Sequence, residues 1–139
     1  MEPEQWDRTG ESPFSTDPLW RMTSFRMSVH LLDEAWRDMK VLQRHRFLDP
    51  VSMQLYKAVG SIGVNLGEGY SRSSGMDRIR FFEYAPGSAR ESQLWYYASR
   101  HVMDPTVLTA RYEILTRIAK ILSKAIPAER HRSIRPKQT

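Results

Sequence analysis

The sequence contains no cysteine. It therefore forms no disulfide bond, offers no thiolate nucleophile and cannot hold zinc or an iron–sulfur cluster through cysteine. It also lacks any apolar run near the ~20 residues that a membrane-spanning helix needs. The first residues are acidic and polar, so they do not resemble a secretory signal peptide. We expect a cytoplasmic protein that is not inserted in a membrane.

Motifs for catalysis are missing as well. No Gly-x-Ser-x-Gly element is present, and the glycines near residue 60 neither follow a strand nor precede the Lys-Ser/Thr of a phosphate loop. The Glu-x-x-His pairs of di-iron bundles do not occur. His30, Asp33 and Glu34 offer a weak metal site, but the pattern fits a solvated helix face better. We expect no metal, no cofactor and no enzymatic activity.

The net charge of +5 combines two segments of opposite sign. Residues 1–17 carry five acids and one base, whereas residues 18–139 carry twenty bases and eleven acids. Arginine outnumbers lysine sixteen to five, and a guanidinium matches phosphate geometry better than an ammonium does. This composition favours an anionic partner such as nucleic acid, with a merely solvated basic surface as the alternative.

Apolar residues recur at helical spacing in four segments separated by short polar stretches. The pattern predicts helices over about 18–44, 51–69, 76–101 and 105–126, within a domain spanning 17–127. Asp-Pro pairs at 17, 49 and 104 mark helix starts, and Pro127 should end the last helix. Residues 1–16 then form a flexible acidic tail and 128–139 a flexible basic one. Four such helices with short loops predict an all-α, antiparallel up-down-up-down four-helix bundle.

Each predicted helix has an expected inner face. The first has a heptad-like seam, flanked by a second stripe of Leu31, Ala35 and Leu42; the seam residues are Met22, Phe25, Val29, Leu32, Trp36 and Met39. The third helix should be kinked by Pro86 and should bury Ile79, Phe82, Ala85, Ala89, Ser92 and Tyr96. The fourth should bury Leu108, Tyr112, Leu115, Ala119, Leu122 and Ile126.

The second predicted helix carries glycines inside its apolar pattern. Leu55, Val59, Ile62 and Leu66 form its inner face, yet Gly60, Gly63 and Gly67 interrupt it. Three interior glycines cost roughly 3 kcal/mol relative to alanine. Close approach of a neighbouring helix, in the same chain or in another, is the simplest compensation. Gly69 should end this helix.

Two polar or aromatic clusters leave alternatives open. Ser61, Asn65 and Glu68 share one helix face, where they either form a site or serve structurally, for instance by pairing Glu68 with Arg72. Residues 95–97 read Trp-Tyr-Tyr, and three consecutive helical residues cannot all face one core. At least one of them should be exposed or buried against another subunit. A base-stacking platform is the alternative.

Two segments resemble a known family. The run 58–72, with Gly60, Ser61, Gly63, Asn65, Gly67, Glu68 and Gly69, is similar to the helix-2 signature of four-helix-bundle proteins related to the 23S rRNA intervening-sequence proteins. The segment 81–91, which ends at Glu91, is similar to the helix-3 signature of that family. The resemblance covers roughly residues 18–126. Gly67 in place of alanine and Pro86 in place of leucine depart from the family pattern, in packing rather than in chemistry.

The resemblance implies a ring-like homopentamer of antiparallel bundles with no established enzymatic activity. More distant relatives are the accessory variability determinant proteins of diversity-generating retroelements. They imply a basic pentamer that binds a reverse transcriptase and nucleic acid.

Basic residues mark one end of the predicted bundle. Because the second and fourth helices run parallel, their C-terminal ends lie together and carry Arg72, Arg78, Arg80, Arg130, Arg132, Arg135 and Lys137. These residues form the candidate contact with RNA or DNA. The alternative is a protein-interaction adaptor, for example an accessory subunit of a reverse transcriptase or another nucleic-acid enzyme.

Overall fold

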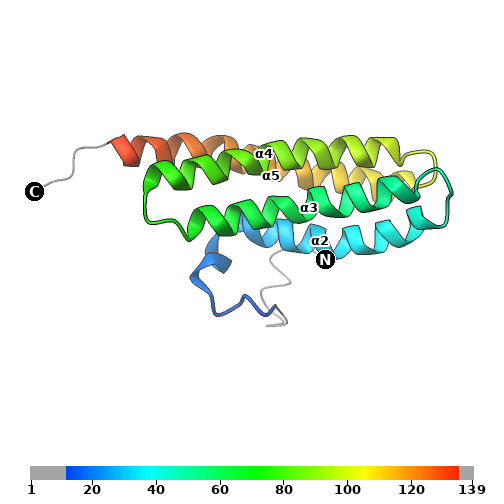
Figure 1. Ribbon diagram of the computed structural model, residues 1–139, viewed down its shortest axis with the longest axis horizontal. Helices are drawn as coiled ribbons and strands as arrows, with labels where there is room; N and C mark the ends of the chain where they lie inside the picture. The colour runs from blue at the N-terminus through cyan, green and yellow to red at the C-terminus, as the bar shows by residue number, and fades with distance from the viewer. Residues whose placement is uncertain (1–11, 135–139) are drawn as a thin grey trace, which may run out of the picture.

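A computed structural model describes residues 12–134 of the chain. A short 3-10 turn, η1 (Pro18–Arg21), precedes four helices: α2 (Thr23–Gln43), α3 (Asp49–Tyr70), α4 (Gly75–Ala98) and α5 (Pro105–Ile134). Successive helices alternate in direction along one long axis (Figure 1). Each helix packs against the next, and α2 against α5 closes the bundle. The predicted all-α, four-helix fold is confirmed, and no strand occurs in residues 12–134.

The first helix begins later than predicted. The Asp17 carboxylate accepts a hydrogen bond from the Leu19 amide at 2.9 Å, but it caps the 3-10 turn rather than an α-helix. Met22 then adopts an extended conformation and α2 starts at Thr23. The Arg26 guanidinium donates to the carbonyl oxygen of Trp20 at 2.5 Å and so holds this bend in place.

Part of the predicted N-terminal tail packs on the bundle. The ring of Phe14 stacks on Trp20 at a centroid distance of 6.2 Å and meets Phe25 edge-on at 5.5 Å. Phe14 thus packs against η1 and α2, although it belongs to the segment 1–16 that was predicted to be a flexible tail. Residues 1–11 of that predicted tail lie outside the described part of the chain.

The buried face of α2 is the predicted flanking stripe rather than the predicted seam. Leu31, Ala35 and Leu42 are fully buried, whereas Trp36 is exposed. Phe25 and Met39 are buried as predicted, and Val29 and Leu32 only in part. The buried stripe of α2 includes a charged residue, Asp38. Apolar spacing alone therefore did not identify this stripe as the inner face.

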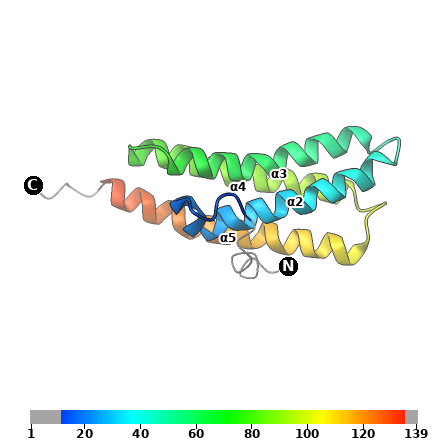
Figure 2. The ribbon, with the colours of Figure 1, turned by 90° about the horizontal axis from the view of Figure 1, so that it is seen from below.

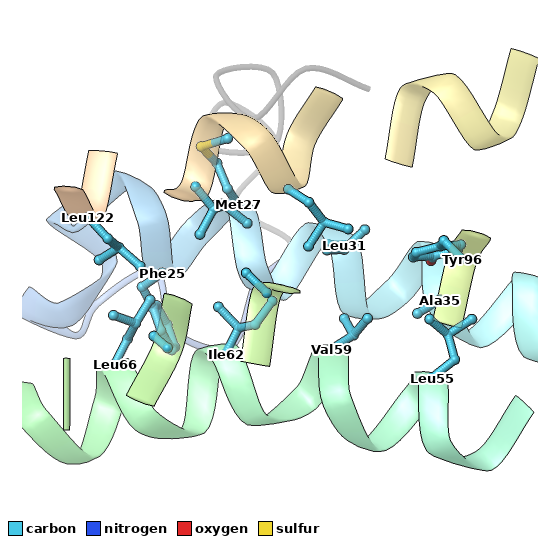
Figure 3. Packing of buried hydrophobic residues seen from close by; sticks show 14 of the residues in the cluster. Phe25, Met27, Leu31, Ala35, Leu55, Val59, Ile62, Leu66, Tyr96 and Leu122 are labelled. Carbon is cyan, nitrogen blue, oxygen red and sulfur yellow. The ribbon is translucent and has the colours of Figure 1, made fainter. Parts of the chain in front are cut away.

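The inner faces predicted for α3 and α4 are confirmed. Figure 3 shows Leu55, Val59, Ile62 and Leu66 of α3 directed toward residues of α2. All six residues predicted to be buried in α4 are buried. In α5, Leu115 and Leu122 are buried as predicted, together with Ile118, which the pattern did not single out; the predicted residues Leu108, Tyr112, Ala119 and Ile126 are partly buried.

Two glycines of α3 mark close contacts within the chain. A Cβ atom at Gly63 would lie 2.9 Å from the hydroxyl oxygen of Ser28 in α2. One at Gly69 would lie 2.7 Å from the ring of Phe82 in α4. At Gly60 and Gly67 the nearest atoms would be at 3.7 and 3.6 Å, which is ordinary contact. Close approach within one chain thus explains Gly63 and Gly69 only.

The last helix does not end at Pro127. It continues to Ile134, so residues 128–134 of the predicted flexible basic tail are helical. A proline inside a helix removes one backbone hydrogen bond. Beyond it, Glu129 is buried and bonded to Arg78 of α4, and Arg130 pairs with Glu83 of the same helix. These contacts hold the last turns of α5 to the bundle. Similarly, α4 runs uninterrupted through Pro86.

Among the described residues, no helix combines the length and the apolar character that crossing a bilayer requires.

The glycine contacts predict opposite effects for two alanine substitutions. Gly67→Ala adds helix propensity without a clash, so the free energy of unfolding should rise by about 0.5–1 kcal/mol. Gly69→Ala should lower it by about 1–3 kcal/mol, because the methyl group overlaps the Phe82 ring. Urea unfolding at one protein concentration measures both. Equal effects of the two variants would contradict this packing.

Candidate functional site

Five of the seven basic residues predicted to contact nucleic acid converge at one end of the bundle, here called the arginine end: Arg72, Arg78, Arg80, Arg130 and Arg132. The first follows α3, the next two lie in the first turns of α4, and the last two lie near the end of α5. Because α3 and α5 run in the same direction, both finish at this end (Figures 1 and 2, left). Arg135 and Lys137 lie outside the described residues.

Ion pairs tie the end of α5 to α4. The Arg78 Nε donates to a carboxylate oxygen of Glu129 at 3.0 Å, and Arg132 pairs with the same carboxylate. Arg130 pairs with Glu83 of α4. The contacts from α4 to α5 join residues that are 51 and 47 positions apart in the sequence. Sequence reasoning found the arginines but had no means of finding these partners.

The remaining two arginines pair within their own segments. Arg72 lies 3.1 Å from a carboxylate oxygen of Glu68, and Arg80 lies 3.9 Å from one of Asp77. Five guanidinium groups therefore face four carboxylates at this end. The arginine end is nearly neutral as it stands, and its capacity for anions depends on how easily these pairs exchange.

Two of these arginines lie over the same aromatic ring. The guanidinium carbons of Arg72 and Arg80 lie over the ring of Phe81, at 4.7 and 5.1 Å from its centroid. Tyr84 meets Phe81 edge-on at 5.9 Å and is about half exposed. Such an arrangement combines cation–π contacts with groups that can bind phosphate.

An open cleft of about 950 Å³ adjoins the ion pairs. Its apolar lining includes Tyr70, Met76 and Phe82, and its charged lining includes Arg78, Glu129 and Arg132. Burial raises the pKa of Glu129, but the hydrogen bonds and charges of Arg132 and Arg78 outweigh burial, so its pKa lies below the ordinary value. The carboxylate is thus charged at neutral pH and occupies both guanidiniums.

A second polar cluster lies between the last turns of α2 and α4 and the first turns of α5, toward the end opposite the arginine end. Arg111 Nε donates to Asp38 at 2.7 Å, and a second nitrogen of the same guanidinium reaches Asp38 at 3.1 Å and Glu34 at 3.0 Å. The Tyr96 hydroxyl donates to Asp38 at 2.7 Å. Burial and the neighbouring Asp38 carboxylate raise the pKa of Tyr96 above its ordinary range, so the phenol stays protonated. No buried nitrogen or oxygen atom of these side chains, here called the Arg111 network, lacks a hydrogen-bond partner, which fits a structural role.

The weak metal candidate does not assemble. Burial raises the pKa of Glu34, but Arg111 and Arg37 outweigh it and hold that pKa below the ordinary value. Glu34 is thus bonded to two guanidiniums rather than free to bind a cation. Burial also lowers the pKa of the His30 imidazole. Within residues 12–134 no three His, Asp or Glu side chains are grouped to hold a metal ion.

The Arg111 network was missed by sequence reasoning, although a signal was present. Asp38 follows Leu31 and Ala35 and precedes Leu42 at spacings of 4, 3 and 4, which places a carboxylate within an apolar stripe. Arg111 lies between Leu108 and Leu115 in the same manner. A charged residue within an apolar stripe implies a buried partner of opposite charge.

The polar residues of α3 bond within their own helix. Ser61 donates to the Lys57 carbonyl at 2.9 Å, and Asn65 donates to the Ser61 carbonyl at 2.8 Å. Glu68 pairs with Arg72, one of the partners considered from the sequence. In α4, Glu91 accepts a hydrogen bond from the Trp95 indole at 3.3 Å. These contacts fit a structural role.

The remaining predicted features separate by exposure. Of the aromatic triplet, Tyr96 is buried and Tyr97 is exposed, which confirms that the three residues do not share one core.

Gly60, Gly63 and Gly67 lie along an apolar groove of about 430 Å³ between α2, α3 and the segment around Phe14. Val64, at the edge of this groove, is 63% exposed.

Fold and site together define an all-α bundle with a guanidinium-rich end and a buried network of charged residues. Residues 22–126 match the model of the 23S rRNA-intervening sequence protein family. This match spans most of the chain, so the protein belongs to that family, and the resemblance inferred from the α3 and α4 signatures is confirmed.

A solved structure shows the same fold. It is a protein of unknown function from the S23 ribosomal protein family of Bacteroides thetaiotaomicron, with a TM-score of 0.69 and 21% sequence identity. The alignment covers 74% of this chain and 97% of that one. At this identity the likeness establishes the fold alone. No curated protein matches the chain.

The Arg111 network predicts a large loss of stability when one partner is removed. Arg111→Gln leaves the Asp38 carboxylate buried without its charge partner, so the free energy of unfolding should fall by about 3–5 kcal/mol. Arg37→Gln, which removes the exposed partner of Glu34, is the control and should cost no more than about 0.5 kcal/mol. Similar losses in both variants would contradict a structural role centred on Arg111.

The lowered pKa values of Glu34 and Glu129 predict sensitivity to acid. Each group binds a proton more weakly in the folded state than in the unfolded state, so its contribution to stability is present above the ordinary glutamate pKa of 4.5. That contribution is lost as pH falls through the lowered folded value. Thermal unfolding between pH 7 and pH 3 should show a falling midpoint below about pH 4.5. A Glu34→Gln, Glu129→Gln variant should lose stability less steeply over that range, and an identical slope would contradict the assignment.

Proposed function

We propose that the protein is a cytoplasmic, non-enzymatic scaffold that binds nucleic acid, RNA or DNA, at the arginine end of the bundle and assembles as a homo-oligomer, with a ring-like pentamer as the expected form. The observation that supports binding is the convergence of five arginines from three segments at one end of the bundle, where two of them, Arg78 and Arg132, line a cleft. Guanidinium groups match phosphate bidentately, and the rings of Phe81 and Tyr84 offer surfaces for bases.

The ion pairs at this end do not prevent phosphate binding. Surface ion pairs contribute only about 0–1 kcal/mol, and Arg80, Arg130 and Arg132 each keep more than half of their side chain exposed. A phosphate can therefore replace a carboxylate partner at little cost. Arg78 is the exception, since it is less exposed and its partner Glu129 is buried. We assign Arg78 to positioning α5 and the other four arginines to contact.

The apolar groove supports assembly. Gly60, Gly63 and Gly67, together with the exposed Val64, form part of an apolar surface between α2 and α3 that a single chain leaves open. Covering it with another copy would remove this surface from water. The same surface favours a second candidate function, in which the protein is an adaptor that docks a protein such as a reverse transcriptase.

Assembly is tested by light scattering. The proposal expects a stable mass several times the 16.3 kDa of one chain. Val64→Lys, which places a charge at the edge of the groove, should reduce that mass, whereas Leu94→Lys on an exposed part of α4 is the matched control. A stable monomer would contradict the assembly.

Nucleic-acid binding is tested by its dependence on salt. The fluorescence anisotropy of a labelled RNA should show that log K falls steeply with log salt concentration, by roughly 0.7–0.9 per phosphate contacted. The variant R72Q/R80Q/R130Q should bind more weakly at every sequence, with a salt slope shallower by about one per arginine. The control K57Q/R90Q/K124Q removes the same charge from exposed positions on the helix sides. A flat salt response, or no binding at low salt, would contradict the proposal.

A further inference from the structure

The opposite end of the bundle carries a second group of cations. The connections from α2 to α3 and from α4 to α5 both lie there, at the right of Figures 1 and 2. This end, here called the turn end, carries Lys40, Arg44, Arg46 and Arg100. Sequence reasoning did not single it out, because the four residues lie in segments some 55 positions apart.

These cations differ from those of the arginine end in having no carboxylate partner. Within residues 12–134, no ion pair joins any of the four to an Asp or Glu side chain. The Asp104 carboxylate is nearby in sequence, but it accepts from the backbone amides of Thr106 and Val107 and so caps α5. The positive charge at the turn end is therefore available to an external anion.

Three of the four cations lie over exposed aromatic rings. Arg100 is 4.0 Å from the centroid of Tyr97, Lys40 is 5.1 Å from Trp36, and Arg46 is 6.0 Å from Phe47. The rings of Tyr97 and Trp36 are about half exposed, and Phe47 is 88% exposed. Burying a phenylalanine contributes about 1.5–3 kcal/mol to folding. Because Phe47 is almost fully exposed, it contributes very little of this stabilisation. The stability of the fold therefore does not explain why a phenylalanine occupies this position.

We infer that the turn end is a binding site for single-stranded nucleic acid, in which Phe47 and Tyr97 stack on bases and Arg44, Arg46 and Arg100 contact phosphates. The inference rests on the proposed function, nucleic-acid binding. It adds a second binding surface and specifies that the nucleic acid bound there is single-stranded. Base–aromatic stacking and cations that follow the backbone are the two elements by which proteins hold single strands. The turn end supplies both on neighbouring side chains.

The arrangement of the rings decides against a duplex and against a membrane surface. Bases in a duplex are stacked on one another and do not present their faces to protein rings. A membrane would require apolar groups together at the tip of the molecule, but His45 and Arg46 precede Phe47 there, and Leu48, which follows it, is partly buried. Trp36 lies seven residues before the end of α2, which is about 10 Å along the helix. The aromatic surface is thus spread along the end and interleaved with charge.

The test uses the full-length protein and a labelled single-stranded RNA of roughly 20 nucleotides, with the same RNA as a duplex. F47A/Y97A removes the two rings, and M53A/L94A is the matched control because it removes two similarly exposed apolar side chains that lie near the same end but are not aromatic. R44Q/R46Q/R100Q removes the charge, and R72Q/R80Q/R130Q tests the arginine end.

We expect F47A/Y97A to weaken single-strand binding about tenfold or more and to leave duplex binding unchanged. R44Q/R46Q/R100Q should weaken single-strand binding and lower its salt slope by about one per residue removed. M53A/L94A should bind as the unchanged protein does. Circular dichroism of each variant excludes unfolding as the cause.

Three results would overturn the inference. If only R72Q/R80Q/R130Q weakens binding, the turn end is not a site, although the proposed function stands. If F47A/Y97A binds RNA normally but loses sedimentation with phosphatidylserine vesicles, the turn end contacts membranes instead. If the unchanged protein binds no nucleic acid at low salt, the proposed function itself fails and the inference fails with it.

Discussion

The ion pair between Arg111 and Asp38 is the interaction on which the bundle depends. Helices α2 and α5 are far apart in the sequence and meet less extensively than the pairs joined by a turn. Arg111 links them through Asp38 and Glu34, and Tyr96 links α4 to the same carboxylate. Because a buried charge without its partner is costly, the geometry of these groups fixes how α5 lies along the bundle. The position of α5 in turn places the residues that it contributes to the arginine end and to the turn end.

The two ends are built differently, and the difference decides what each can bind. At the arginine end, Glu129 and Glu83 hold Arg78 and Arg130, so these cations serve partly to fasten α5, and under the proposed function they exchange with phosphate only where the pairs are exposed. At the turn end, Arg46 and Arg100 lie against the rings of Phe47 and Tyr97 instead of against carboxylates. This difference cannot be seen from the number of arginines alone. It follows from whether each guanidinium lies against a carboxylate or against an aromatic ring.

Much of the fold followed from apolar spacing, because Leu55, Val59, Ile62 and Leu66 and the small residues of α4 repeat with a helical period. The inner face of α2 did not follow, since a charged Asp38 belongs to it. The helical continuation past Pro127 also escaped prediction, because Arg78 and Glu129 are distant in sequence and local rules give proline a large weight. For the candidate site, the convergence of the arginines could be predicted from topology, whereas their carboxylate partners and the turn end depend on contacts between remote segments.

Ultraviolet cross-linking of the full-length protein to a single-stranded RNA, with the cross-linked peptides mapped by mass spectrometry, tests the central claim that the ends of the bundle bind nucleic acid. The claim predicts cross-links in peptides that contain Phe47 or Tyr97 at the turn end, and Phe81 or Tyr84 at the arginine end. Cross-links confined to the middle of the helices, around the exposed residues Lys57 and Arg90, or their complete absence, would contradict it.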